Sequence, residues 1–245
     1  MRINIRIAVL SLLLVVLVAV GVCTDDSCAS THAVHSPPPA TVAEKIISHS
    51  LDFRISGETS LRTIGGGTYV KHDGVPYVLT ALHVWDVLIE MDNADCIAVC
   101  HKNDCVCVSD EDEVASEIVE DWALIRLPRT VEGTKPAKMS KKTFPVGTQV
   151  YIVGAPDGVA LIVTQGMIAA RTNTSREPFP HYMIDGYAYY GSSGGGLFTK
   201  RGKLIGVVTS IDTNVGILLG FPFPHENPNL VYATPLSEVS FPSEE

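Results

Sequence analysis

Short runs of apolar and β-branched residues recur along the chain from about Phe53 onward, and Gly, Pro, Asn and Asp separate them. Runs of this length bounded by turn-forming residues are typical of β-strands. No long amphipathic helical stretch lies between them, which argues against a parallel βαβ sheet and favours antiparallel barrels or sandwiches. The sequence therefore predicts an all-β protein. The runs that predict strands are 67–70, 77–80, 122–127, 149–153, 160–164 and 204–209.

Three other segments carry weaker patterns. Thr41 and Glu44 have the spacing of a capping box, which predicts a short helix through about Ser48. The acidic segment 108–120 is most simply a solvated loop, and the proline-spaced segment 221–245 is expected to cap the domain.

The N-terminal segment has the pattern of an export signal. Arg2 and Arg6 precede an uncharged run over 7–22, and this order is typical of a secretory signal. The run is shorter than the about 18 to 20 apolar residues of a spanning helix. An uncleaved membrane anchor and lipidation at Cys23 are the alternatives.

These patterns divide the chain into a signal or anchor over 1–23, a proline-rich linker over 24–40 and one globular domain over 41–245. We expect an exported protein, in the periplasm, outside the cell or tethered to a membrane and facing outward. The histidines in or beside this leader are expected to be solvated; they are His32, His35 and His49.

Composition limits the partners. The chain has 245 residues and a formal net charge of -9, with no basic run longer than Lys141-Lys142 or Lys200-Arg201. Nucleic acid is excluded as an expected partner because it requires a basic surface. No motif predicts a cofactor.

Four of the six cysteines lie close together, at Cys96, Cys100, Cys105 and Cys107. In an exported protein such a cluster predicts disulfides. A Cys105–Cys107 bridge fits extended chain poorly, which leaves Cys96–Cys105 with Cys100–Cys107, or Cys96–Cys107 with Cys100–Cys105. A zinc site that includes His101 is the alternative, although the spacing does not reproduce a C-x2-C knuckle.

Candidate chemistry begins with the glycine-rich segment 190–196, which contains Ser193. A nucleophilic serine requires a tight, exposed turn whose amides point at the substrate carbonyl oxygen, and glycine permits such a turn. The segment therefore predicts Ser193 as nucleophile, with the amides of Gly191 and Ser193 as an oxyanion hole. A glycine-rich hairpin without chemistry is the alternative.

Two further residues support the catalytic interpretation. His83 follows the hydrophobic strand that begins at Tyr77, and Asp121 precedes the strand that begins at Trp122. Either residue alone is more often structural. Their order with Ser193 along the chain matches a His–Asp–Ser triad.

These three segments resemble the trypsin-like serine peptidase superfamily, and in particular its HtrA/Deg-type branch. Residues 80–84 resemble its TNxHV segment, 121–125 its DxAxL segment and 191–196 its GNSGGP segment. The similarity covers roughly Thr63 to Ser210. It implies two six-stranded antiparallel β-barrels with the active site in the cleft between them.

The resemblance also implies a mechanism, in which His83 acts as general base, Asp121 orients it and Ser193 forms an acyl-enzyme. The specificity pocket would be walled by Tyr187, Val208, Thr209 and Ser210. Tyr187 stands where trypsin has the acidic residue that selects Arg or Lys. We therefore expect a serine endopeptidase that cleaves proteins or peptides after small or medium apolar residues.

The chain departs from the family pattern at several points. Gly196 stands where proline is frequent, which we expect to be harmless, and Ser192 replaces the commoner Asn or Asp. The cysteine cluster resembles an insertion, and the 35 residues after Ser210 are too few for a PDZ domain of the usual size. The alternatives are a catalytically silent peptide-binding relative and an esterase that uses the same triad. The common α/β-hydrolase esterases have their triad in another chain order.

Overall fold

The computed structural model describes residues 39–56, 61–91, 96–155, 161–172, 181–218 and 221–242. The predicted signal or anchor and nearly all of the predicted linker lie outside these residues, as do His32 and His35. Among the helices that are described, none has the length and apolar character needed to cross a membrane.

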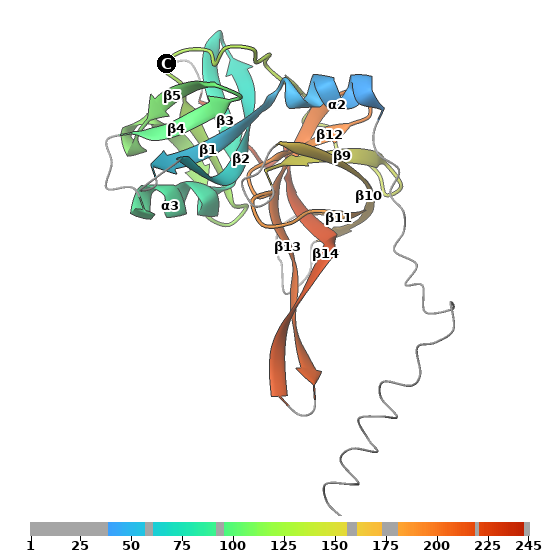
Figure 1. The fold of residues 1–245 in the computed structure, drawn as a ribbon. Helices are drawn as coiled ribbons and strands as arrows, with labels where there is room; N and C mark the ends of the chain where they lie inside the picture. Colours follow the sequence, from blue (N-terminus) through green and yellow to red (C-terminus); the bar gives the residue numbers. More distant parts are fainter. Residues whose placement is uncertain are drawn as a thin grey trace, which may run out of the picture. The chain divides into compact units, whose positions relative to one another are not determined.

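Strands make up most of the described chain, in agreement with the predicted all-β class (Figure 1). Each run that predicted a strand overlaps one. The helical elements are α2 (Ala40–Ile47), the 3-10 turn η1 (Asp110–Asp112) and α3 (Leu82–Met91). The strands are β1 (Ser50–Ser56), β2 (Leu61–His72), β3 (Val75–Thr80), β4 (Ile97–His101), β5 (Asp104–Val108), β6 (Glu113–Glu117), β7 (Trp122–Arg126), β8 (Lys138–Met139), β9 (Gln149–Gly154), β10 (Ile162–Thr172), β11 (His181–Gly186), β12 (Gly196–Thr199), β13 (Lys203–Leu218) and β14 (Phe221–Pro235).

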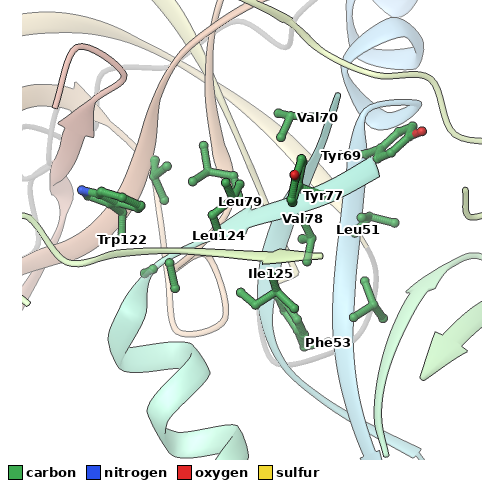
Figure 2. Packing of buried hydrophobic residues seen from close by; sticks show 14 of the residues in the cluster. Leu51, Phe53, Tyr69, Val70, Tyr77, Val78, Leu79, Trp122, Leu124 and Ile125 are labelled. Carbon is green, nitrogen blue, oxygen red and sulfur yellow. The ribbon is translucent and has the colours of Figure 1, made fainter. Parts of the chain in front are cut away.

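The N-terminal half is a curled seven-stranded sheet in the order β5-β4-β1-β2-β3-β7-β6. All of its neighbouring strands pair antiparallel. Figure 2 shows side chains from β1, β2, β3 and β7 packed into one core, among them Phe53, Tyr69, Leu79 and Leu124. Burying one such side chain stabilises the fold by about 1.5–3 kcal/mol.

The C-terminal half is a closed barrel of six strands. Its order is β12-β9-β10-β11-β14-β13, and pairing between β13 and β12 closes the ring. The short strand β8 adds to β13 in parallel. The predicted double-barrel fold is confirmed, with one difference: in the described residues the first half is a curled sheet of seven strands rather than a closed ring of six.

Two segment predictions were wrong. The acidic segment 108–120 is not a simple loop, because it contains η1 and β6, which pairs with β7 at the sheet edge. Edge strands often carry charged side chains, and β6 is half-buried or exposed throughout. The segment therefore lacks the apolar run by which the other strands were predicted. The segment 221–245 contains the long strand β14, although proline normally argues against a strand because it lacks a donor.

The predicted N-terminal helix is confirmed as α2, although its start differs. It begins at Ala40 after Pro39, and no side-chain hydrogen bond caps its first turn. The capping box that Thr41 and Glu44 suggested is therefore not formed. Proline before the first turn supplies a fixed backbone angle that is compatible with helix entry.

The four clustered cysteines form two disulfides across the hairpin of β4 and β5. Cys96 is bonded to Cys107 and Cys100 to Cys105, with Cα atoms 5.0 and 4.1 Å apart. This is one of the two pairings left open by the sequence. All four sulfurs are oxidised, so none is a thiolate ligand for zinc. The hairpin lies at the sheet edge opposite β6, where the bonds hold the edge strand β5 in register with β4.

His49 was expected to be solvated, but it is only 5% exposed. Its Nδ1 lies 2.6 Å from the carbonyl oxygen of Lys135, and its ring stacks on Phe198. A carbonyl only accepts, so Nδ1 carries the hydrogen and Nε2 is the bare nitrogen. Nε2 is buried and has no hydrogen-bond partner in the described part of the chain. Burial lowers the pKa of His49, and the positive charges of Lys45 and Lys135 lower it further, against the hydrogen bond to the Lys135 carbonyl.

This lowered pKa predicts a loss of stability in mild acid. The unfolded chain binds a proton at His49 from about pH 6.5 downward, whereas the folded chain resists it. The free energy of unfolding contributed by His49 is therefore fully present above about pH 6.5 and decreases as the pH falls toward the folded-state pKa. We expect His49→Gln to lose less stability than the wild type between about pH 7.5 and 5 in urea unfolding.

The matched control is His72→Gln, which removes a partly exposed histidine. It should keep the acid sensitivity of the wild type. Equal acid losses in His49→Gln and the wild type would contradict the assignment.

Candidate active site

His83 lies in the first turn of helix α3, not at the end of a strand as the sequence suggested. Strand β3 ends at Thr80 and α3 begins at Leu82. The backbone N–H of His83 donates to Asp121 Oδ1 at 2.9 Å, and His83 Nδ1 lies 2.7 Å from Asp121 Oδ2. The carboxylate therefore fixes both the backbone and the ring of His83. This arrangement leaves Nε2 as the ring nitrogen that can accept a proton.

Asp121 is held in a left-handed backbone conformation, with a φ of 53°. Asp adopts this region more readily than most residues, and such conformations gather at functional sites. The carbonyl of the preceding Glu120 accepts a hydrogen bond from Thr234 Oγ1 on β14. The turn before β7 is thus tied to the C-terminal barrel. The carboxylate also lies at the N-terminus of α3, where negative charge is favourable.

The glycine-rich loop before β12 contains a tight turn. Ser192 N–H donates to the carbonyl of Tyr189 at 2.9 Å, and Gly191 has a φ of 89°. A positive φ at the third position is the mark of a type II turn, which favours glycine there. Type I and type II turns differ in the orientation of their central peptide. In a type II turn the N–H of Gly191 therefore points to the opposite face of the turn.

Neither the N–H of Gly191 nor that of Ser193 has an acceptor among the hydrogen bonds of the described residues. Backbone donors are nearly always satisfied in folded proteins. Within the described residues, both amides of this serine loop are thus available to bind an acceptor from outside the chain.

The backbone of Ser193 is bonded to the other half of the molecule. Its carbonyl accepts the N–H of Gly66 on β2 at 2.9 Å, and the carbonyl of Gly66 accepts Thr80 Oγ1 at 2.8 Å. A Cβ at Gly66 would lie 3.2 Å from the Cα of Gly195, which is a tight contact. The glycines of β2 therefore allow the two backbones to approach each other.

Helix α3 and the serine loop both lie close to Gly65 of β2. A Cβ at Gly65 would lie 2.6 Å from Cγ1 of Val84, the residue after His83, and 3.3 Å from the carbonyl oxygen of Ser193. The structure thus places Val84, the neighbour of His83, and the backbone of Ser193 against the same face of Gly65. Ser193 Oγ itself donates to the carbonyl of Thr209 at 3.3 Å, and no hydrogen bond to His83 is formed among the described residues.

The residues predicted to wall a specificity pocket fall into two groups. Val208 and Thr209 are buried on β13 beside the serine loop. Val208 exchanges two backbone hydrogen bonds of 2.8 Å with Gly194 and Gly195. Ser210 is exposed, one residue further along β13.

Tyr187 forms the second group, and it lines a small pocket together with Ser192 of the serine loop. It follows β11, and its side chain is 41% exposed. Its carbonyl accepts Thr164 Oγ1 at 2.6 Å, which anchors the segment to β10. The backbone here is therefore fixed, while the aromatic ring faces outward.

Gly196 is more constrained than its sequence suggested. A Cβ there would lie 2.4 Å from the ring of Phe198 and 2.6 Å from Thr68 Oγ1. The proline that is frequent at this position in relatives would clash with this packing. Glycine in place of proline at position 196 is therefore compatible with the packing of Phe198 and Thr68.

Asp86 was not predicted as a site residue. It lies one helical turn after His83, and partial burial raises its pKa, followed by the charges of Glu113, Glu90 and Asp121. The spacing of His83 and Asp86 would have identified it only if the helix had been predicted. No group of His, Cys, Asp and Glu able to hold a metal ion is found within the residues that the structure describes.

A two-barrel β fold with a paired His and Asp and a serine in a glycine turn between the halves defines the class of trypsin-like peptidases. The family model of the trypsin-like peptidase domain matches residues 65–207. The chain belongs to this family.

Curated relatives agree with this assignment. The serine endoprotease DegS of Salmonella typhimurium is 28% identical over 214 residues, which are 83% of this chain and 56% of DegS. A probable periplasmic DegP-like serine endoprotease of a Marinomonas species is 31% identical, over 66% of this chain and 32% of the relative. The chain thus spans about half the length of the first relative and about a third of the second.

Solved structures show the same fold. An HtrA-type protease, AlgW, solved with a decapeptide, superposes with a TM-score of 0.59 at 18% identity and covers 80% of this chain and 62% of its own. A serine endoprotease from Yersinia pestis gives a TM-score of 0.56 at 22% identity, over 82% of this chain and 64% of its own. At such identities the likeness shows the fold alone.

Proposed function

We propose that the protein is an exported serine endopeptidase that acts through His83, Asp121 and Ser193. The observation that supports this most directly is the double hydrogen bond of Asp121 to His83, beside a serine turn with two unsatisfied amides. Its peptidase domain spans about 41–245, after a signal or anchor over 1–23 and a linker over 24–40. Relatives named as periplasmic serine endoproteases support export.

In the proposed mechanism Ser193 Oγ exchanges its hydrogen bond to Thr209 for one to His83 Nε2. Catalytic hydrogen bonds in an empty site often form only with substrate. Nε2 takes the hydroxyl proton as Oγ attacks the scissile carbonyl, and Asp121 stabilises the resulting imidazolium. His83 then gives the proton to the leaving amine, and water hydrolyses the acyl-enzyme.

The amides of Gly191 and Ser193 would stabilise the oxyanion of each tetrahedral intermediate. Their donors need no rearrangement in the type II turn, because neither is already engaged. Loss of one such donor costs about 2.7–4 kcal/mol in the transition state. A Gly191 amide turned out of the site would therefore slow the reaction by about 10²–10³-fold.

Fluorophosphonate labelling tests the nucleophile. We expect the wild type to be labelled, Ser193→Ala to lose all labelling, and Asp121→Asn to be labelled more slowly by several orders of magnitude, because His83 loses the correct tautomer (about 10⁴-fold in the family template). Ser116→Ala, which removes an exposed serine on β6, is the matched control and should label as the wild type. Labelling that persists in Ser193→Ala would contradict the assignment of Ser193 as the nucleophile.

We further propose cleavage after small or medium apolar residues. The walls formed by Tyr187, Val208 and Thr209 carry no charge, so a substrate Lys or Arg would lose hydration without gaining a partner. A peptide-library profile should show Ala, Val or Leu before the cleaved bond, with Ser193→Ala inactive on the same library. A profile dominated by Arg or Lys would overturn the specificity.

A catalytically silent peptide-binding relative is the second candidate. The bond from Ser193 Oγ to the Thr209 carbonyl favours it, because the nucleophile is then turned away from His83. Digestion of casein distinguishes the candidates: the endopeptidase releases fragments, an esterase with the same triad is labelled without releasing them, and the silent form does neither.

A further inference from the structure

A cavity of about 540 Å³ lies on the C-terminal barrel and shares no lining residue with the candidate active site. Three separate segments form it: the stretch after β8, the start of β9 and the turn between β12 and β13. Its volume falls in the range of about 300–1,000 Å³ that is typical of small-molecule sites. The lining residues are Ser140, Lys142, Phe144, Gly147, Thr148, Gln149, Thr199, Lys200, Arg201 and Lys203.

The charge of this cavity is opposite to that of the whole chain. Four of the lining residues are cations, namely Lys142, Lys200, Arg201 and Lys203, and no Asp or Glu is among them. None of the four makes an ion pair in the described parts of the chain. The formal net charge of the chain is -9, so a group of cations without carboxylates runs against its average composition. Like charges held together repel one another, and a bound anion relieves that repulsion.

The walls of the cavity are fixed by hydrogen bonds. Ser140 N–H donates to the Leu204 carbonyl at 2.9 Å, which ties the first segment to β13. In the β12–β13 turn, Lys203 N–H donates to Thr199 Oγ1 at 3.2 Å. The ammonium group of Lys45 on α2 donates to the Arg201 carbonyl at 2.7 Å. The backbone is thus preorganised, while the cationic side chains that it carries are exposed and unpaired.

An apolar surface completes the site. Phe144 is half-buried in the wall, and its backbone N–H donates to the Tyr182 hydroxyl at 3.1 Å, which holds the segment in place. Arg and Lys are the side chains that recognise phosphate oxygens, Arg through a planar fork and Lys as a point charge. An aromatic residue beside them adds contact for the part of a ligand that carries no charge.

We propose that this cavity binds a phosphate ester with more than one negative charge and a partly apolar body. The phosphates contact the four cations and the apolar part lies against Phe144. Two sources share this chemistry, a soluble phosphorylated metabolite and the headgroup of an anionic lipid. The proposal does not depend on peptidase activity, because the cavity is separate from Ser193.

Binding to the full chain tests the proposal with inorganic tripolyphosphate, measured by titration calorimetry at about 50 mM salt, where charges are weakly screened. We expect binding to the wild type and a weakening of about tenfold or more in the double variant Lys142→Gln/Arg201→Gln, because two charge-assisted contacts are lost. The matched control is Lys71→Gln/Arg126→Gln, which removes the same charge from exposed positions on β2 and β7. It should bind within about twofold of the wild type.

A second arm identifies the source of the ligand. Vesicles of phosphatidic acid, which carries a phosphate monoester, in phosphatidylcholine are compared with vesicles of phosphatidylcholine alone. Cosedimentation with the anionic vesicles that the cavity variant loses and the control keeps supports a lipid headgroup; binding of tripolyphosphate alone supports a soluble phosphate ester. Binding of neither probe, or an equal loss in both double variants, overturns the proposal.

Discussion

The hydrogen bond from Gly66 N–H to the Ser193 carbonyl is the contact on which the site depends. It joins the backbones of the two halves directly, without side chains between them. Such an approach is possible only where Cβ atoms are missing on both sides. A Cβ at Gly194 would lie 2.2 Å from the carbonyl oxygen of Gly66, and one at Gly66 would lie 3.2 Å from the Cα of Gly195. The close contact between the two backbones therefore requires glycine in both halves.

Hydrogen bonds between the two halves also position the residues of the candidate site. Asp121 belongs to the N-terminal sheet, yet the carbonyl before it is held by Thr234 of the C-terminal barrel. Ser193 belongs to the barrel, yet its carbonyl is held by Gly66 of the sheet. Each half therefore positions a residue of the proposed triad that the other half carries. The disulfide-bonded hairpin of β4 and β5 stabilises the far edge of the sheet and leaves this junction unobstructed.

Much of this arrangement could be predicted from the sequence. Local patterns, namely apolar runs, turn residues and ordered motifs, predict the all-β class and the relation to trypsin-like peptidases. They also identify His83, Asp121 and Ser193 as candidate site residues. The helix that carries His83 was missed because its apolar residues continue the hydrophobic run of β3, and periodicity alone cannot divide a strand from a following short helix.

Other features are set by long-range contacts. The burial of His49 results from packing against Phe198 and Lys135, which are distant in sequence. Strand β14 contains prolines, yet it pairs with the distant strand β11 as well as with β13. The positive φ of Asp121 has no local sequence signal, since Asp is equally common in ordinary turns.

We propose that the serine turn has its catalytic geometry before substrate binds. A crystal structure of the protein after reaction with a peptidyl phosphonate tests it most directly. We expect phosphorus bonded to Ser193 Oγ, with one phosphonate oxygen about 2.7–3.1 Å from both the Gly191 and the Ser193 amide nitrogens, and Gly191 still at positive φ. An adduct whose oxygen lies away from these amides, or a Gly191 amide turned out of the site, would contradict it.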